Sequence, residues 1–390
     1  MSRHALLLLA VGALACTDGN DPAAVATDAG SESSPDTGGV GSGGSSQNPD
    51  ANGGAAGSSG SAGSADSGPS CSLANVTNIA VAAIDLEGYP PYAVDACKLA
   101  YVSATSGALL LRDLATGSDV EMAPASEAPR RPTLAGDVLA WQSGDGVGSQ
   151  VRVSFGGQVR TATGAFVRAG EPRATVDAVV FTGWLTDTDS DVFQVRAAGP
   201  AQVVLGGSGQ QRFADISPTH VAVSDFSEDP SGVYSGDGTS LSDLVLIERA
   251  TGAVRRRTAA GKQAFPLLGV QNRMVFLEWV GVHPVPKFQE YALRALDLNA
   301  LDAEPLTIDQ VTSDRPTVRP VARGEFVEWV ERPVDRMALF FRAKLESAAT
   351  PVAITGLEGL ELFAPAASDT ITVIAVRAAT GGPTLRAIER

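Results

Sequence analysis

Three aspartates at alternate positions are the best candidates for metal chemistry in this 390-residue sequence. They are Asp187, Asp189 and Asp191, in the segment TDTDSDVF. Alternate carboxylates around a tight loop can chelate a hard cation such as Ca²⁺. The segment lacks the glycine and terminal glutamate of an EF-hand loop, so a solvated acidic turn is the competing interpretation. Calcium is therefore the one cofactor that the sequence suggests, and we expect no cofactor to be required.

A second acidic segment runs from Asp225 to Asp243 and contains Glu228, Asp229 and Asp237. It is the longest insertion in the repeats described below, and long loops often carry binding residues. Carboxylates can also hydrolyse glycosides when two of them face each other across a sugar, a geometry that sequence does not show. We therefore predict a binding loop, with a polysaccharide hydrolase or lyase as the alternative function.

Other catalytic groups are scarce. His220 lies in an apolar stretch and His283 in the proline-rich segment GVHPVPKF, and no nucleophile-elbow, phosphate-loop or dinucleotide motif occurs. The formal net charge is −15 and the basic residues are scattered, which argues against a nucleic-acid partner. We therefore predict that the protein is not an enzyme.

A sequence motif that repeats along the chain, which we call the repeated phrase, defines the strands that must position these residues. It consists of a proline, a turn residue and an apolar run that ends in an aromatic, and it recurs about every 40–53 residues. Two weak copies cover residues 212–226 and 362–376, and the clear copies end at Tyr101, Trp141, Phe181, Trp279 and Trp329. Short strands with this period are typical of β-propellers, in which each copy forms one four-stranded blade and the aromatic fills the gap between blades.

We therefore expect an all-β fold over residues 71–390, a β-propeller of seven four-stranded blades. Six or eight blades also fit the weak copies, and a β-helix or two β-sandwiches are the structural alternatives. The last copy lacks a fourth strand, whereas residues 74–84 form a strand without a blade. Pairing the two would close the ring and remove exposed strand edges.

Four enlarged loops follow the second strand of copies three to six. Loops between the second and third strands of propeller blades emerge on one face, so we expect these loops to form one binding surface. Its candidate residues are Asp187, Asp189, Asp191, Glu228, Asp229, Asp237, His283 and Arg332.

The first sixteen residues, MSRHALLLLAVGALAC, read as an export signal. Arg3 precedes a short apolar stretch, and small residues precede Cys16. This resembles the lipobox of bacterial lipoproteins, which implies a signal peptide over residues 1–15 and lipidation of Cys16. An ordinary secretory signal, cleaved after Ala15, is the alternative.

Residues 17–70 contain mostly Gly, Ser, Ala, Asp, Asn and Pro, with Val25 and Val40 as the only large aliphatic residues. Such a segment cannot bury enough apolar surface to fold, so we expect a lipidated, disordered tether over residues 16–70. Its composition resembles myxobacterial lipoprotein tethers. Cys71 and Cys97 then remain as an even pair in an exported chain and are expected to form a disulfide, with two free thiols as the alternative.

The phrases VLAW, FLEW and FVEW, which end at Trp141, Trp279 and Trp329, resemble the repeats of TolB-like periplasmic propellers. The resemblance covers residues 75–390 and implies a fold and an interaction role rather than a reaction. We therefore expect a monomeric cell-envelope protein, lipid-anchored at the outer membrane and facing the periplasm or the cell surface. It would display a non-enzymatic binding or scaffold domain to a protein or glycan partner.

Overall fold

The computed structural model describes residues 71–390 apart from residues 84, 86, 87, 236–239, 259–261, 283–287, 314–318, 334–336 and 346–349. The predicted signal peptide and tether, with Cys16, lie outside the described residues, as do Asp237 and His283. Two short 3₁₀ turns, η1 (Leu73–Asn75) and η2 (Ala125–Glu127), accompany the strands. No helix in the described part of the chain is long and apolar enough to cross a membrane.

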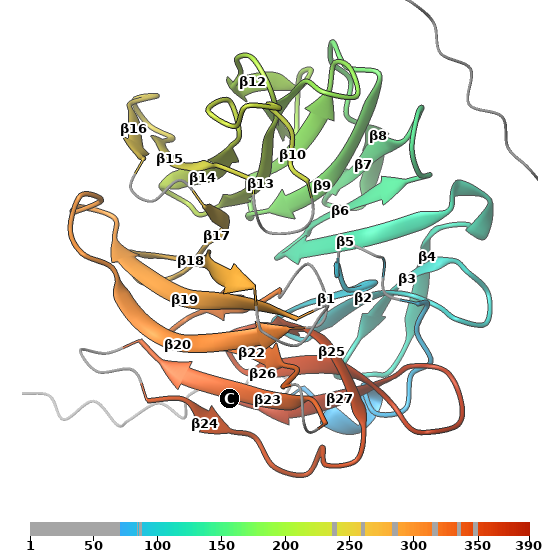
Figure 1. The fold of residues 1–390 in the computed structure, drawn as a ribbon. Helices are drawn as coiled ribbons and strands as arrows, with labels where there is room; N and C mark the ends of the chain where they lie inside the picture. Colours follow the sequence, from blue (N-terminus) through green and yellow to red (C-terminus); the bar gives the residue numbers. More distant parts are fainter. Residues whose placement is uncertain are drawn as a thin grey trace, which may run out of the picture. The chain divides into compact units, whose positions relative to one another are not determined.

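Seven antiparallel sheets form a ring of blades, which confirms the predicted seven-bladed β-propeller (Figure 1). Within each sheet the strands follow one another in chain order, so every blade is a simple meander. The strands of the first four blades are β1 (Tyr92–Asp95), β2 (Lys98–Val102), β3 (Leu109–Asp113) and β4 (Asp119–Ala123); β5 (Pro129–Ala135), β6 (Val138–Ser143), β7 (Gln150–Phe155) and β8 (Gln158–Thr161); β9 (Arg168–Ala174), β10 (Ala178–Trp184), β11 (Ser190–Arg196) and β12 (Gln202–Leu205); and β13 (Gln211–Ile216), β14 (His220–Asp225), β15 (Asp243–Glu248) and β16 (Val254–Arg257).

The remaining blades continue the same order. Their strands are β17 (Gln263–Val270), β18 (Arg273–Val282), β19 (Gln289–Asp297) and β20 (Leu306–Ser313); β21 (Val321–Arg323), β22 (Phe326–Glu331), β23 (Leu339–Lys344) and β24 (Val352–Ala353); and β25 (Glu361–Ala367), β26 (Ile371–Arg377) and β27 (Thr384–Glu389). The first strand of each blade contacts the first strand of the next blade all the way around the ring. These seven strands therefore surround the central axis.

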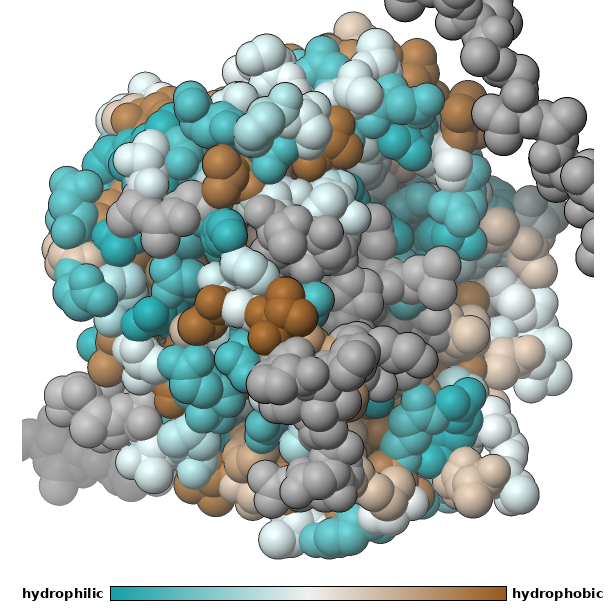
Figure 2. Space-filling model, in the orientation of Figure 1, coloured by the Kyte–Doolittle hydropathy of each residue, from teal (hydrophilic) through white to brown (hydrophobic). Residues whose placement is uncertain are grey.

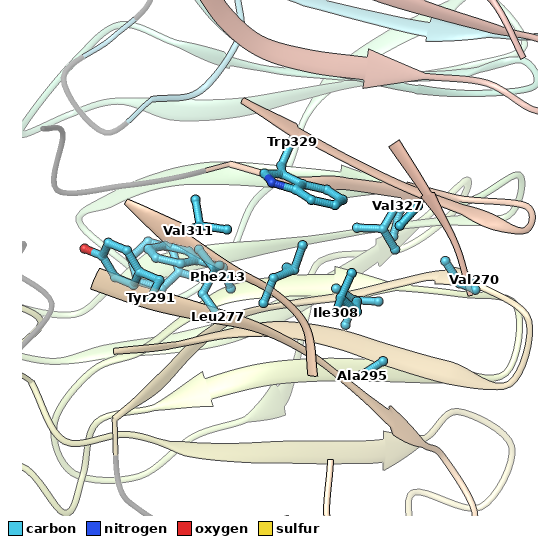
Figure 3. Close-up of a cluster of buried hydrophobic side chains, with 14 of the residues drawn as sticks. Phe213, Val270, Leu277, Tyr291, Ala295, Ile308, Val311, Val327 and Trp329 are labelled. Atoms are coloured by element: carbon cyan, nitrogen blue, oxygen red, sulfur yellow. The ribbon is translucent and has the colours of Figure 1, made fainter. Parts of the chain in front are cut away.

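The second strands supply the core between blades. Trp141, Phe181 and Trp329 are fully buried there, as the repeated phrase predicted. In Figure 3, Trp329 of β22 lies against side chains of blade five that include Leu277 and Val311. Burying such aromatic rings between facing sheets is a large part of what holds neighbouring blades together.

Trp279 packs against the core between blades five and six, but it is not the fully buried aromatic of its strand. The buried aromatic of β18 is Phe276, which occupies the fourth position of its strand, as Trp141 does in β6. Trp279 comes three residues later and is only partly buried. The cause is the length of β18, because its apolar run continues past the centre of the core to the end of the blade.

The N-terminal segment closes the ring, as predicted, although its strand is shorter than expected. Ala80 pairs with Thr384 of β27, and Val81 pairs with Ser103 beyond β2, so the segment joins blade seven to blade one. Residues 74–84 are not one strand, because η1 occupies their start and Asn78 has a left-handed backbone with φ of 68°. Only the residues after this turn are free to pair as a strand.

The Cys71–Cys97 disulfide is present, with 5.2 Å between the two Cα atoms. Cys97 lies in the turn between β1 and β2, so the bond fixes the start of the closing segment to blade one. Hydrogen bonds attach the same segment to blade seven, with the N–H of Asn78 donating to Leu385 and that of Val81 donating to Pro383, both at 3.1 Å.

Candidate functional site

The loops between second and third strands meet the connections between blades on one face, as the sequence predicted. Gln210, which precedes β13, shows this most clearly. Its side-chain amide donates to the carbonyl of Asp187 at 3.1 Å, and its backbone N–H donates to the carbonyl of Gly232 at 2.8 Å. The predicted loops of blades three and four are therefore tied to the same connection.

The three aspartates proposed for calcium have different surroundings. Asp187 is exposed, Asp189 is half-buried, and Asp191 is buried with its carboxylate accepting from the N–H of Gly207 at 3.3 Å. Burial raises the pKa of Asp191, and the neighbouring Asp189 adds to the effect. Among the described residues no group of three or more acidic, histidine or cysteine side chains is arranged to hold a metal ion. Calcium binding at these three aspartates therefore stays a prediction.

The other predicted residues have separate roles. Glu228 is exposed, whereas Asp229 organises its own loop by accepting from the N–H groups of Ser231 and Leu241, each at 2.8 Å. Arg332 donates to the carbonyl of Leu362, which links its loop to blade seven. The structure does not gather these three residues into one site.

Blade five projects further than the other blades on this face. Its strands β18 and β19 are the longest in the ring, and β18 leaves Val280 and Val282 more than half exposed. In Figure 2, apolar surface lies near the ends of β18 and β19 and is bordered by hydrophilic side chains. This projection therefore exposes apolar side chains on the predicted binding face.

A second set of functional candidates lies on the inner strands. Arg131, Glu171, Phe213 and Phe265 all have positive φ, between 45° and 60° in round numbers, at a β-bulge in the first strand of their blade. Three of them directly precede a proline, as do Tyr89 and Arg319 in other blades. A bulge redirects a side chain out of the regular alternation, and here it turns these side chains toward one end of the axis.

Side chains at these positions close one end of the central channel, which runs along the axis between the seven inner strands. The guanidinium of Arg319 lies 3.8 Å from the centre of the Tyr89 ring and 4.1 Å from that of Phe265. Arg131 covers Tyr89 as well, at 4.3 Å. Tyr89, Phe265 and Arg319 are all buried, so this stack of cations and aromatic rings occludes the mouth.

Glu171 is the acidic member of this layer. Its carboxylate accepts from the hydroxyl of Thr182 at 2.8 Å and from Arg212, which is contributed by the next blade. Burial raises the pKa of Glu171, but the cations Arg212 and Arg131 outweigh burial and bring this pKa to about 2. Glu171 is therefore ionised at neutral pH and links blades three and four through its ion pair with Arg212.

Below the stack the axis widens into a cavity of about 140 Å³, which we call the channel cavity. Its lining includes Arg173, Asp215 and Arg323, with prolines and aliphatic residues between them. Asp215 accepts from the N–H of Leu268 at 2.7 Å, and burial raises the pKa of its carboxyl group. Arg323 is paired with Asp95 at 2.7 Å and with Asp369 at 3.4 Å.

The channel cavity opens into a larger bowl, of about 420 Å³, on the face of the turns that follow the first strands. Thr175, Ser217 and Gln271 supply polar groups to the bowl, and Val176 and Leu268 supply apolar ones. The channel is therefore a funnel that is open at the bowl and closed at the stack. This concave site with converging polar groups has the character of a ligand site.

The funnel could not be predicted from the sequence, because the residues that form it differ in type from blade to blade. The positions before proline hold Tyr, Arg, Glu and Phe, and only the closed ring brings them together. Their one common signal was the proline itself, which marks the inner strand.

Comparison with solved structures supports the fold alone. The β-propeller domain of the Trilobed protease from Pyrococcus furiosus, which has an open velcro topology, is 11% identical over 80% of this chain and 95% of that chain, with a TM-score of 0.53. A chain of the mitotic checkpoint complex is 11% identical over 80% of this chain and 93% of that one, with a TM-score of 0.51. Here, in contrast to the open topology, residues 78–81 close the ring.

TolB from Acinetobacter baumannii is also similar, with 12% identity and a TM-score of 0.42. The match covers 64% of this chain and 60% of the TolB chain, so this chain spans less than two thirds of that protein. The sequence matches no protein-family model and no curated protein. The structure and these comparisons together define the class: the chain is a seven-bladed β-propeller, and it shares the β-propeller fold with the domain of the Trilobed protease.

Proposed function

We propose that this protein is a non-enzymatic binding module of the cell envelope and that its propeller holds a partner at the funnel. The observation that carries this proposal is the funnel itself, a concave site lined by the arginines Arg173 and Arg323 and by the amide side chain of Gln271. Deep concave sites with a few oriented polar groups are the usual places for ligands.

The channel carboxylates favour binding over sugar hydrolysis. Glycoside hydrolysis uses two carboxyl groups, one on each side of the scissile bond. Glu171 is 1% exposed and is enclosed by Thr182 and Arg212, so it cannot reach a substrate in the funnel. Asp215 is the only carboxylate among the described residues that line the channel cavity, and Asp369, the carboxylate of the bowl, is paired with Arg323 at 3.4 Å.

The predicted location forms part of the proposal. A lipid on Cys16 and the tether that follows would hold the propeller at the membrane while leaving it free to rotate. Replacing Cys16 by Ser should move the protein from the membrane fraction to the soluble fraction of a cell extract. If the variant stays in the membrane fraction, lipidation at Cys16 is refuted.

Site-specific photocrosslinking in the native envelope tests the binding role. A benzoylphenylalanine would replace Val176 at the bowl, Val280 on the opposite face, or Val254 on the outermost strand of blade four. These three valines are 70%, 51% and 53% exposed, so they are matched in residue type and accessibility.

A discrete crosslinked species from position 176, and none from position 254, would support the funnel as the binding site. A species from position 280 alone would instead favour the projecting face and refute the funnel. If no position gives a discrete species in cells that grow normally, the binding proposal itself fails.

A further inference from the structure

Arg173 is the cation of the funnel with the weakest ties to the fold, since its guanidinium lies 5.4 Å from the centre of the Tyr89 ring and forms only one long ion pair. It lies on β9, two residues after the bulged Glu171, and lines both the channel cavity and the small space under the stack. Within the described residues its guanidinium makes no hydrogen bond to protein, and its nearest carboxylate is Asp215 at 4.0 Å. A guanidinium carries five N–H donors, so Arg173 keeps its hydrogen-bonding capacity for whatever fills the cavity.

The other charges do not satisfy Arg173. Asp215 is committed to the N–H of Leu268, and burial raises the pKa of its carboxyl group, which weakens it as a counter-ion. Arg323 already has two carboxylate partners, Asp95 and Asp369. The depth of the funnel therefore favours a ligand that brings its own negative charge.

The shape of the funnel selects the end of a chain. A ligand that enters through the bowl meets the stack of Tyr89, Arg319 and Phe265, which occludes the far mouth. A polymer cannot pass through, so the group that reaches Arg173 must be a terminus.

The walls of the bowl favour a polypeptide over a glycan. Gln271 offers a side-chain amide that can pair with a peptide backbone, whereas the hydroxyls of Thr175 and Ser217 are bonded within their own turns, to Asp177 and to the backbone of His220. Val176 and Leu268 offer aliphatic surface for a side chain. Among the described residues that line the bowl there is no aromatic ring on which a sugar could stack.

We propose that the funnel captures the free C-terminus of a partner protein, with its carboxylate on Arg173 and its last residues extended through the bowl. This inference rests on the proposed binding function and adds the chemistry of the ligand. Arginine recognises carboxylates through paired, charge-assisted hydrogen bonds, and capture of a C-terminal carboxylate is an established mode of peptide recognition.

Calorimetric titration of the full-length protein tests the proposal. The probes are acetyl-Gly-Ala-Ala-Val as the free acid, the same peptide amidated at its C-terminus, acetate, and galacturonic acid. The free acid should bind, and amidation should weaken binding roughly 10- to 100-fold, because it removes the charged acceptor from Arg173.

Arg173→Gln should weaken binding of the free acid by a similar factor. Arg255→Gln on the exposed strand β16 is the matched control and should have no effect. Both variants must first show an unchanged thermal midpoint. If Arg173→Gln is destabilised, the more conservative Arg173→Lys replaces it and should still weaken binding.

Each other outcome overturns the inference. Equal binding of the acid and the amide would exclude carboxylate capture, and equal binding of peptide and acetate would indicate a small-anion site only. Binding of galacturonic acid without the peptide would identify a glycan ligand. If no probe binds but position 176 still crosslinks to a partner, the ligand chemistry is wrong and the binding function survives.

Discussion

The hydroxyl of Tyr92 should be worth several degrees of thermal stability, because it connects the first blade to the last. Tyr92 is fully buried on β1, and its hydroxyl donates to the carbonyl of Ala364 at 2.5 Å and accepts from the N–H of Ala375 at 2.8 Å. The pairing of β25 with β26 shifts register between Leu362 and Pro365. The hydroxyl thus occupies the gap that this bulge leaves in the ladder.

Replacing Tyr92 by Phe keeps the ring but leaves two buried backbone groups without their partner. Each unsatisfied buried group costs about 1–3 kcal/mol, so we expect a loss of roughly 2–6 kcal/mol in the free energy of unfolding. A domain of about 320 residues has an unfolding entropy of about 0.7 kcal/mol/K, which converts this loss to a fall in Tm of roughly 3–9 °C.

Thermal unfolding followed by circular dichroism measures this fall. Tyr101→Phe is the matched control, since its hydroxyl bonds Asp119 within blade one, at 3.2 Å, and connects no two blades. Its Tm should fall by about 1 °C or less, because a hydrogen bond near the surface can be replaced by water. Equal shifts in the two variants would refute the assignment of Tyr92 as the seam between the ends of the ring.

Three further outcomes follow from the structure. Replacing Cys71 and Cys97 by Ser should lower the free energy of unfolding by roughly 3 kcal/mol, measured by urea unfolding, and an unchanged midpoint would show that the closing segment holds without the bond. Glu171 has a folded-state pKa of about 2 against an ordinary 4.5, so its stabilisation is complete above about pH 4.5 and is lost as the pH falls toward 2. Glu171→Gln should flatten this acid dependence of the urea midpoint, and an unchanged slope would exclude Glu171 as its source. Gly269→Ala should destabilise by roughly 1–3 kcal/mol or more, because the added Cβ would lie 1.7 Å from the carbonyl oxygen of Ala322, whereas Gly281→Ala, with nothing within 4 Å, should be neutral.

The fold was predictable from the sequence because its signal is repeated. Trp141, Phe181 and Trp329 are buried for the same reason in their three blades, so their spacing revealed the period. Trp279 is less buried than these three, because hydrophobicity does not distinguish the centre of the core from its edge. The closing segment was predictable as a partner for β27, but its length was not, since the left-handed turn at Asn78 depends on local backbone geometry.

The funnel was not predictable by the same means. Arg173 and Asp215 come from different blades, and nothing in their own segments distinguishes them from surface residues. Their shared position, two residues after a bulge, becomes visible only when the ring places the inner strands side by side. Sequence reasoning therefore concentrated on the acidic loops, where charge is dense but the side chains do not converge.

The disulfide also determines how the propeller would respond to force. A pull on the chain before residue 71 reaches Cys71 first and passes through the covalent bond into Cys97 and blade one. The hydrogen bonds at Asn78 and Val81 lie beyond this point in the chain, so the covalent bond takes up most of the force before it reaches them. If the propeller is held at its N-terminus while a partner pulls on the funnel, its ring would therefore stay closed. The hydrogen bonds between the closing segment and β27 lie outside the main path of the force.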